Sequence, residues 1–288
     1  MDSRLRTNLL LAAVLAAAVG AIVFGPESGR KSPGVPLFDS TEYIARVAVF
    51  DNGKLRFALR REESSWRLVA PVDLLADSFQ VDALLAQLRE PASRRYPVNE
   101  TDPAALGLDS PRWRIKAGER ELLLGGSTAL GGQRYVQMGD HVYLVDDLLV
   151  YRIQRDPFDY ASKDVLPGDR EVRAITLPSG QRVERKGSGW TVIPEIGALS
   201  ADALQHVVSA WRNARALRVV PADSVPRDGE VQVEFESGEA LRFGIELRED
   251  ELRLSRADPA VTYVLPLSEA DDLLQVTTGG NAIGTAPQ

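Results

Sequence analysis

"SFQVDALLAQL", residues 78–88, and "SADALQHVVSAW", residues 200–211, carry apolar side chains at the same intervals in two distant parts of the chain. The intervals i, i+3, i+4 and i+7 form one stripe of an amphipathic helix. The stripe residues are Val81, Leu84, Leu85 and Leu88 in the first stretch and Leu204, Val207, Val208 and Trp211 in the second. Asp77 and Ser200 are N-cap residue types, and Gln80 adds a capping-box partner to Asp77. The spacing predicts two equivalent helices.

The segments that flank the two helices also correspond. Upstream, "WRLVAP" (66–71) matches "WTVIP" (190–194), and each is preceded by two alternating strands around a Gly-containing turn. Downstream, each helix is followed by two further hairpins, which place Tyr143 and Tyr263 at equivalent positions. The alternating runs predict antiparallel sheets with one apolar and one polar face.

Trp66 and Trp190 open the matching strands. We interpret both as core anchors where the helix meets the sheet, and stacking on a ligand is the alternative role for either ring.

The expected fold class is α+β, with two tandem pseudo-repeat lobes that each consist of an antiparallel sheet packed by one main helix, after an N-terminal transmembrane helix. The expected segments are 1–25 (transmembrane anchor or signal), 26–40 (flexible linker), 41–153 (first α+β repeat), 154–169 (connector), 170–275 (second α+β repeat) and 276–288 (disordered tail).

Composition excludes several kinds of chemistry. The 288 residues include no Cys, which removes disulfides, thiolate catalysis and Cys-based zinc sites. Only two His residues are present, so a His-rich metal site is excluded as well. The net charge of -7 argues against a nucleic-acid partner. We therefore expect no nucleic acid, metal or cofactor, and no catalytic residue is assigned.

The N-terminal region has the pattern of an export or anchoring segment. Arg4 and Arg6 precede an apolar run from Leu9 to Phe24, and a Pro- and Gly-rich stretch follows. A positive flank before the run keeps the N-terminus in the cytoplasm and exports the rest. We expect an uncleaved anchor because the chain stays apolar after residues 19–21, the small-residue site at which a signal peptide would be cut. A cleaved signal peptide and a buried helix of a soluble protein are the alternatives.

The region after the first helix carries a recognisable set of motifs. The Trp–Pro strand and the capped helix lead into "ASRRYPV", followed by "LGLDSP" (106–111), a "LLLGG" turn, and Tyr135-Val136 before "VYLV". Together they resemble the bacterial family known as domain of unknown function 4340 over roughly residues 40–275. The second copy has "VPRDGEV" where the first has Leu-Gly-Leu-Asp-x-Pro. These motifs are turn and core signatures, which specify a fold rather than a chemistry.

The resemblance implies a membrane-anchored envelope protein. Many proteins of this kind are associated with an ABC-type export system of the gliding-motility type, beside its permease and an auxiliary extracytoplasmic subunit. The implied location is the bacterial inner membrane, single-pass, with the bulk of the chain in the periplasm. The family provides no catalytic residues to carry over.

Two groups of residues deserve testing as sites. The loop "GGSTALGGQ" (125–133) is Gly-rich like a phosphate-binding loop, but it lacks the following Lys and helix of a P-loop, so a wide hairpin turn is the favoured interpretation. If the loop binds a ligand, Ser127, Thr128 and Arg134 are the residues to test. His141, in a hairpin turn, and His206, on the polar side of a helix, are expected to be exposed.

Charged clusters have ordinary explanations. The acidic pairs 146–147, 249–251 and 271–272 lack the spacing of a calcium loop and are expected to be solvated turns. "REPASRRYPV", with Arg89, Arg94 and Arg95, could contact anionic lipid or an acidic partner, and a solvated helix end is the alternative.

The function we expect is that of a non-enzymatic, membrane-anchored envelope protein, an auxiliary or binding component of an ABC-type transport system, with a permease or auxiliary subunit as its partner. The cleft between the lobes is the default place for a small ligand. The alternative is an envelope hydrolase that acts on glycan or peptide through carboxylates in that cleft. A third possibility, a polysaccharide-binding module, would need exposed aromatic residues, and only 7% of the chain is Phe, Trp or Tyr.

Overall fold

The computed structural model describes residues 34–38, 43–129, 131–168, 170–195, 199–222 and 229–276. The predicted anchor at 1–25 and nearly all of the predicted tail at 276–288 lie outside these ranges. Among the helices within them, none combines the length and the apolar character that a membrane crossing requires.

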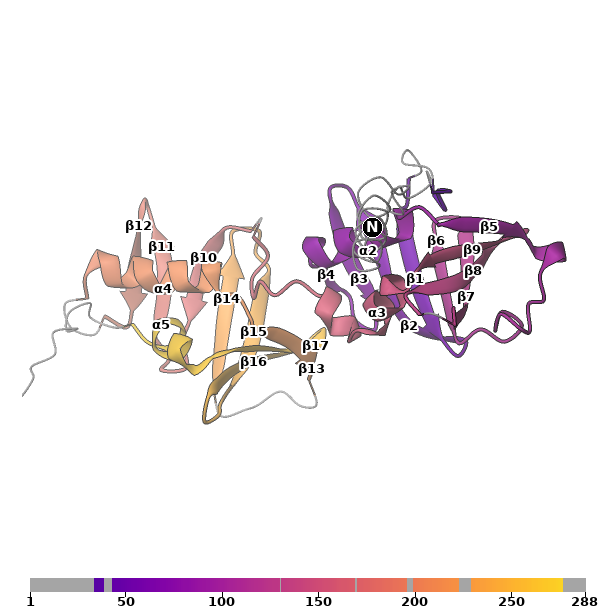
Figure 1. The fold of residues 1–288 in the computed structure, drawn as a ribbon. Coiled ribbons are helices and arrows are strands. Elements are labelled where there is room, and N and C mark those ends of the chain that lie inside the picture. Colours follow the sequence, from indigo (N-terminus) through magenta and orange to yellow (C-terminus); the bar gives the residue numbers. More distant parts are fainter. Residues whose placement is uncertain are drawn as a thin grey trace, which may run out of the picture.

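Two antiparallel sheets form two lobes (Figure 1). The strand order of the first sheet is β4 (Leu74–Leu75), β3 (Ser65–Ala70), β2 (Lys54–Glu62), β1 (Arg46–Asp51), β6 (Trp113–Ala117), β7 (Arg120–Ser127), β8 (Gln133–Met138), β9 (His141–Asp146) and β5 (Arg94–Pro97). The order of the second is β12 (Gly189–Ile193), β11 (Arg182–Lys186), β10 (Val172–Thr176), β14 (Glu230–Phe235), β15 (Ala240–Leu247), β16 (Glu251–Ala257), β17 (Ala260–Pro266) and β13 (Arg218–Pro221). Apart from β4, the two orders correspond strand for strand, so the sequence repeat is also a repeat of topology.

Helices cover one face of each sheet (Figure 1). They are α2 (Ser78–Arg89) and α3 (Leu148–Gln154) in the first lobe, and α4 (Ala201–Asn213) and α5 (Ala270–Leu274) in the second, with 3-10 turns η1 (Val98–Glu100), η2 (Pro157–Tyr160) and η3 (Leu267–Glu269). The prediction of two antiparallel lobes is confirmed. The helices are short, so the described fold is mostly β rather than an even α+β mixture.

The two main helices are those that the apolar stripes predict. All four stripe residues of α2 are buried, as are those of α4. The Asp77 side chain accepts a hydrogen bond from Gln80 N at 3.1 Å, and Ser200 does the same for Ala203 N at 3.1 Å. The capping box was a wrong prediction, because Gln80 Oε1 instead accepts from Arg155 and the Asp77 N–H donates to Tyr160 O.

The two equivalent tryptophans have different surroundings. Trp66 is 5% exposed and belongs to the core, as predicted. Trp190 is only half-buried, and its Nε1 donates to the surface residue Gln205 at 3.0 Å. Within the described part of the chain β12 is the last strand of its sheet, whereas β4 extends the first sheet beyond β3. In the second lobe Trp211, on α4, is a fully buried tryptophan.

Residues 34–38 pack on the first lobe although the sequence places them in a flexible linker. Val35 and Ala92 exchange two backbone hydrogen bonds of 2.8 Å. Leu37 and Phe38 are 2% and 1% exposed. This end of the expected 26–40 linker is therefore part of the folded body.

Candidate functional site

The cleft between the lobes is the largest hollow that we describe, with a volume of about 1060 Å³. Residues 62–65, 67 and 73–75 of the first lobe line one side, and Leu241, Arg256, Pro259 and Tyr263 of the second lobe line the other. Residues 162, 164–168 and 170, which lie between the two lobes in sequence, complete the lining.

The connecting segment is bonded to both lobes. Tyr160 stacks on Phe57 with ring centroids 4.7 Å apart, and burial raises the pKa of Tyr160 to about 12. Ser162 N donates to Leu75 O at 2.7 Å in the first lobe. In the second lobe, Ala216 N donates to Lys163 O at 2.8 Å. Backbone hydrogen bonds therefore attach the connecting segment to the lobe on each side of the cleft.

Four carboxylates line the cleft, and three of them, all but Glu63, lie close to arginines. Arg67 binds Asp73 at 2.7 Å and lies 3.7 Å from Glu62. Asp164 accepts from Arg215 at 2.8 Å. A glycosidase uses a pair of carboxyl groups that flank the scissile bond. The hydrolase alternative stays a prediction.

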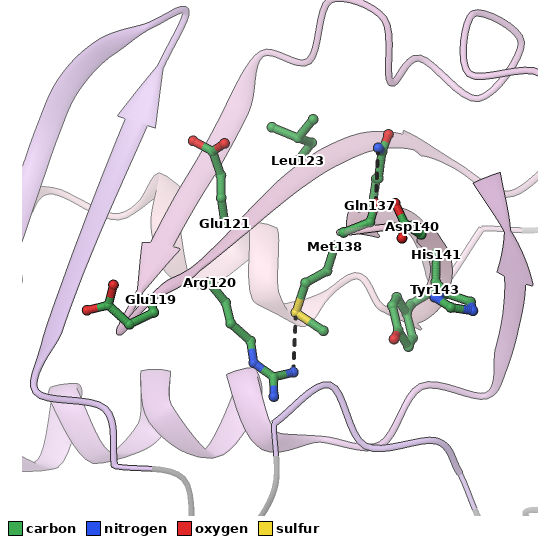
Figure 2. Close-up of a pocket in the computed structure, with 10 residues that line it drawn as sticks. Glu119, Arg120, Glu121, Leu123, Gln137, Met138, Asp140, His141 and Tyr143 are labelled. Carbon is green, nitrogen blue, oxygen red and sulfur yellow. Dashed lines mark hydrogen bonds between the residues drawn. The ribbon is translucent and has the colours of Figure 1, made fainter. Parts of the chain in front are cut away.

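A second hollow, of about 660 Å³, lies at the start of β7 and the β8–β9 turn (Figure 2). In this view Arg120 and Met138 extend to one side of the sheet, and Glu121 and Leu123 extend to the other. Arg120 Nη1 donates to Leu37 O at 2.6 Å, and its guanidinium lies 5.3 Å from the Phe38 ring centroid. The arginine thus holds the N-terminal segment against the first lobe.

The two histidines lie in different lobes and have different surroundings. His141 lines the hollow of Figure 2 and is half-buried, so the prediction that it is exposed is only partly met. His206 is exposed as predicted and lies 2.9 Å from Asp272. Among the described residues, no group of three or more His, Asp and Glu side chains is placed to hold a metal ion.

The predicted ligand loop joins β7 to β8, as the hairpin interpretation expects. Ser127 pairs with Arg134 in the ladder, and Thr128 Oγ1 donates to Gly131 O at 3.2 Å. Arg134 Nε donates to Asp147 Oδ1 at 2.6 Å. Its guanidinium also donates to Gly125 O. The structure therefore brings Ser127 and Arg134 together but engages the charge of Arg134 within the protein.

The acidic pairs take part in local contacts. Asp146 accepts from Leu148 N at the start of α3 at 3.0 Å, and Glu251 binds Arg218. Of the basic stretch, only Arg89 lies in the last turn of α2. Arg94 and Arg95 lie on β5 and are exposed, so the helix-end explanation does not apply to them.

A third hollow, of about 720 Å³, lies in the second lobe, where the sequence analysis predicted no site. We name it the β16 recess, after the strand that bears Arg253 and Ser255. Ser255 and Thr262 are 3% and 5% exposed, and their hydroxyls are 2.8 Å apart. Glu246 accepts from Arg248 Nε at 3.0 Å at its rim. The one available signal was a pair of hydroxyl residues on strands predicted to form a hairpin.

These features define a two-lobed, mostly β protein with open hollows in which polar groups are largely paired with one another. The chain belongs to the family described as domain of unknown function (DUF4340), whose profile matches residues 66–231, more than half of its length. No curated protein and no solved structure matches the chain at a significant level.

Proposed function

We propose that this protein is a non-enzymatic, single-pass envelope protein that acts as an auxiliary or binding component of an ABC-type transport system. Its lobes would lie on the outer side of the inner membrane, held by the apolar N-terminal segment. The resemblance of the motifs to a membrane-anchored family supports the location. The observation that carries a binding role is an exposed apolar surface on the helices of the first lobe.

That surface is formed by Phe79 on α2 and by Leu148 and Tyr151 on α3, and we name it the helix patch. Their exposed fractions are 73%, 54% and 66%. Leu148 and Tyr151 are three residues apart on one helix and therefore share a face. Large side chains gathered at high exposure typically mark a contact surface for a partner.

The two helices that carry these side chains contact each other. Arg155 Nη1 donates to Gln80 Oε1 at 3.1 Å, which places the start of α2 beside the end of α3. Phe79 is next to Gln80 in sequence, and Tyr151 lies one turn before Arg155. The residues of the helix patch therefore lie on two neighbouring helices.

Because residues 34–38 pack on the first lobe, they limit how far this lobe can lie from the membrane. If the anchor ends at residue 25, residues 26–33 form the tether, and eight extended residues span at most about 28 Å. That distance keeps the first lobe, more than the second, close to integral membrane subunits. A permease or an extracytoplasmic subunit beside it is the partner that this geometry favours.

Site-specific photocrosslinking in intact cells tests the proposal. A photoreactive phenylalanine analogue replaces Phe79 or Tyr151, and the matched control carries it at Ile193, which is 50% exposed in the second lobe. We expect adducts with an ABC permease or its auxiliary subunit from positions 79 and 151 and not from 193. Recovery of no transport subunit from either position of the helix patch contradicts the proposal.

The orientation has its own test. Alkaline phosphatase fused after residue 288 is active only outside the cytoplasm, and a cytoplasmic fluorescent reporter gives the converse signal. We expect an active phosphatase fusion in the membrane fraction and a mass that retains residues 1–25. A fluorescent reporter in the cytoplasm would contradict the export of the lobes.

A further inference from the structure

The strand registers identify equivalent positions on β5 and β13, the strands that end the two described sheet orders. Leu144 of β9 corresponds to Val264 of β17, because each follows the tyrosine that the repeat places at equivalent positions. Arg94 pairs with Leu144, and Arg218 pairs with Val264. The two strands therefore match as Arg94 with Arg218, Arg95 with Val219, Tyr96 with Val220, and Pro97 with Pro221.

In the second lobe the arginine of this strand is paired within the protein. Arg218 binds the carboxylate of Glu251 on the nearby strand β16. Val219 is 5% exposed and belongs to the core. Strand β13 therefore carries a single charge, and that charge is already balanced.

In the first lobe the corresponding charges have no such partner. Gln133 stands at the position of Glu251, since each pairs with the residue two positions after Leu144 or its equivalent. Arg94 Nη1 donates to the Tyr96 hydroxyl at 3.5 Å, and no carboxylate of the described residues forms an ion pair with Arg94 or Arg95. Both arginines are exposed. A chain of net charge -7 thus keeps two unpaired cations next to each other on this strand.

The same strand begins beside the place where the N-terminal segment reaches the first lobe. Gly34 packs so closely there that a Cβ atom on it would lie 2.5 Å from the Cβ of Pro91. Val35 and Ala92 exchange two backbone hydrogen bonds of 2.8 Å. Arg94 follows Ala92 by two residues, which is at most about 7 Å along the chain. The two unpaired arginines therefore lie beside the attachment point of the tether.

We propose that the edge formed by Arg94, Arg95 and Tyr96, which we name the basic edge, contacts the anionic phospholipid headgroups of the membrane. The proposal rests on the anchor of the proposed function, and it is independent of the transport role and of the helix patch. A tether of residues 26–33 spans at most about 28 Å, so the headgroups stay within reach of the first lobe. An arginine close to an anionic surface favours contact about fivefold.

The chemistry of the basic edge fits a charged surface better than a partner strand. Pro97 has no N–H to donate, and arginines on an outer strand oppose pairing with another chain. Arg94 and Arg95 point to opposite faces of the sheet, so their charges lie along the edge rather than on one face. Tyr96 is half-buried on the face of Arg94, and tyrosine is typical of membrane–water interfaces.

Energy transfer to labelled lipid tests the proposal on the full chain in vesicles. The chain has no Cys, so Asn99→Cys provides a single attachment point for a fluorescent donor near the basic edge. Ser237→Cys provides a reference position on the second lobe. Vesicles of phosphatidylcholine, with and without phosphatidylglycerol, carry the acceptor on a headgroup. We expect phosphatidylglycerol to raise transfer from residue 99 more than from residue 237, and added salt to reverse the rise.

Substitutions locate the contact. Arg94→Gln combined with Arg95→Gln should weaken it about twenty-five-fold and return the transfer to its value in neutral vesicles. Gln133→Glu restores the carboxylate that the second lobe has, and by pairing with Arg94 it should weaken the contact about fivefold. The control combines Lys186→Gln with Arg242→Gln, which removes two exposed charges from the second lobe and should leave the transfer from residue 99 unchanged.

The outcomes separate the basic edge from the anchor. Equal transfer in the two kinds of vesicle, or unchanged transfer in the folded Arg94→Gln, Arg95→Gln variant, overturns the proposal. That result is expected if an acidic protein surface covers the basic edge instead. A chain that floats with neither kind of vesicle contradicts the anchor, and the lipid contact with it. A chain that floats with both kinds but shows no effect of phosphatidylglycerol contradicts the lipid contact alone.

Discussion

Arg182 on β11 and Glu234 on β14 are joined across the intervening strand β10 by two hydrogen bonds of 2.7 and 2.8 Å. The pair spans three strands, and Thr176 of the middle strand lies 3.4 Å from the same guanidinium. The Arg182 guanidinium lowers the pKa of Glu234 below its ordinary value of 4.5, and the carboxylate raises the pKa of Arg182. An ion pair thus links strands of the second lobe in addition to the backbone hydrogen bonds of the sheet.

Glu234→Gln should lower the free energy of unfolding by about 1–2 kcal/mol at pH 7. A depressed pKa in the folded state stabilises the fold above about pH 4.5, and this contribution is lost as the pH falls through the lowered value. The difference between wild type and variant should therefore be smaller at pH 3 than at pH 7. Urea denaturation at both pH values checks this. Glu230→Gln, an exposed carboxylate on the same strand, is the control; a loss of equal size there would count against the pair.

Gly125→Ala should destabilise the first lobe by about 1–3 kcal/mol, since a Cβ there would lie 2.3 Å from Leu106 O and the 101–112 loop must move. Gly126→Ala is a matched control because its Cβ would lie 3.6 Å from the same atom, an ordinary contact. Thermal unfolding followed by circular dichroism measures both. Similar midpoints for the two variants would show that the loop does not depend on the close approach.

Trp211→Phe should cost about 1–3 kcal/mol because Trp211 Nε1 donates to Leu273 O at 2.8 Å in the core and ties α4 to α5. Trp190→Phe should cost less than about 1 kcal/mol, because its hydrogen bond to Gln205 is at the surface. Chemical denaturation of the two variants ranks them. The reverse order would mean that Trp190 is the anchor of the second lobe after all.

Glu269→Gln should raise the melting temperature at pH 7. Burial, with a smaller contribution from Asp272, raises the pKa of Glu269 above 4.5, so its charged form is disfavoured in the fold. For a raised pKa, the fold is relatively most stable below the unfolded value and loses that stability as the pH rises through the folded value. The gain from the substitution should therefore vanish below about pH 4. An equal gain at pH 3.5 would point to a cause other than charge.

Much of the local structure was predictable because it depends on neighbours in sequence. Asn52 and Gly53 adopt positive φ angles of 48° and 78°, which a tight hairpin turn requires and which these residue types tolerate. The stripes and caps of α2 and α4 follow from side chains within one or two turns. The repeat was visible because both copies have the same apolar spacing, N-cap residue types and Gly-containing turns.

The exposure of matched residues was not predictable from the repeat. Trp66 and Trp190 occupy equivalent strands, but among the strands that the structure describes only the first sheet has a further one, β4, beyond that edge. A two-residue strand carries too little pattern to be recognised. The burial of Leu37 and Phe38 was missed for a similar reason, because their contacts are with residues more than fifty positions away.

The sequence by itself determined the two helices, their caps, the hairpin turns and the duplication, because each depends on backbone preferences and side-chain periodicity over about ten residues. Only the tertiary structure decided which polar groups meet. Arg134 is matched to Asp147 and Arg253 is left with a buried N–H, although both lie on equivalent strands. The physical reason is that these distances depend on the order and register of strands far apart in the chain, and on which loop covers each sheet.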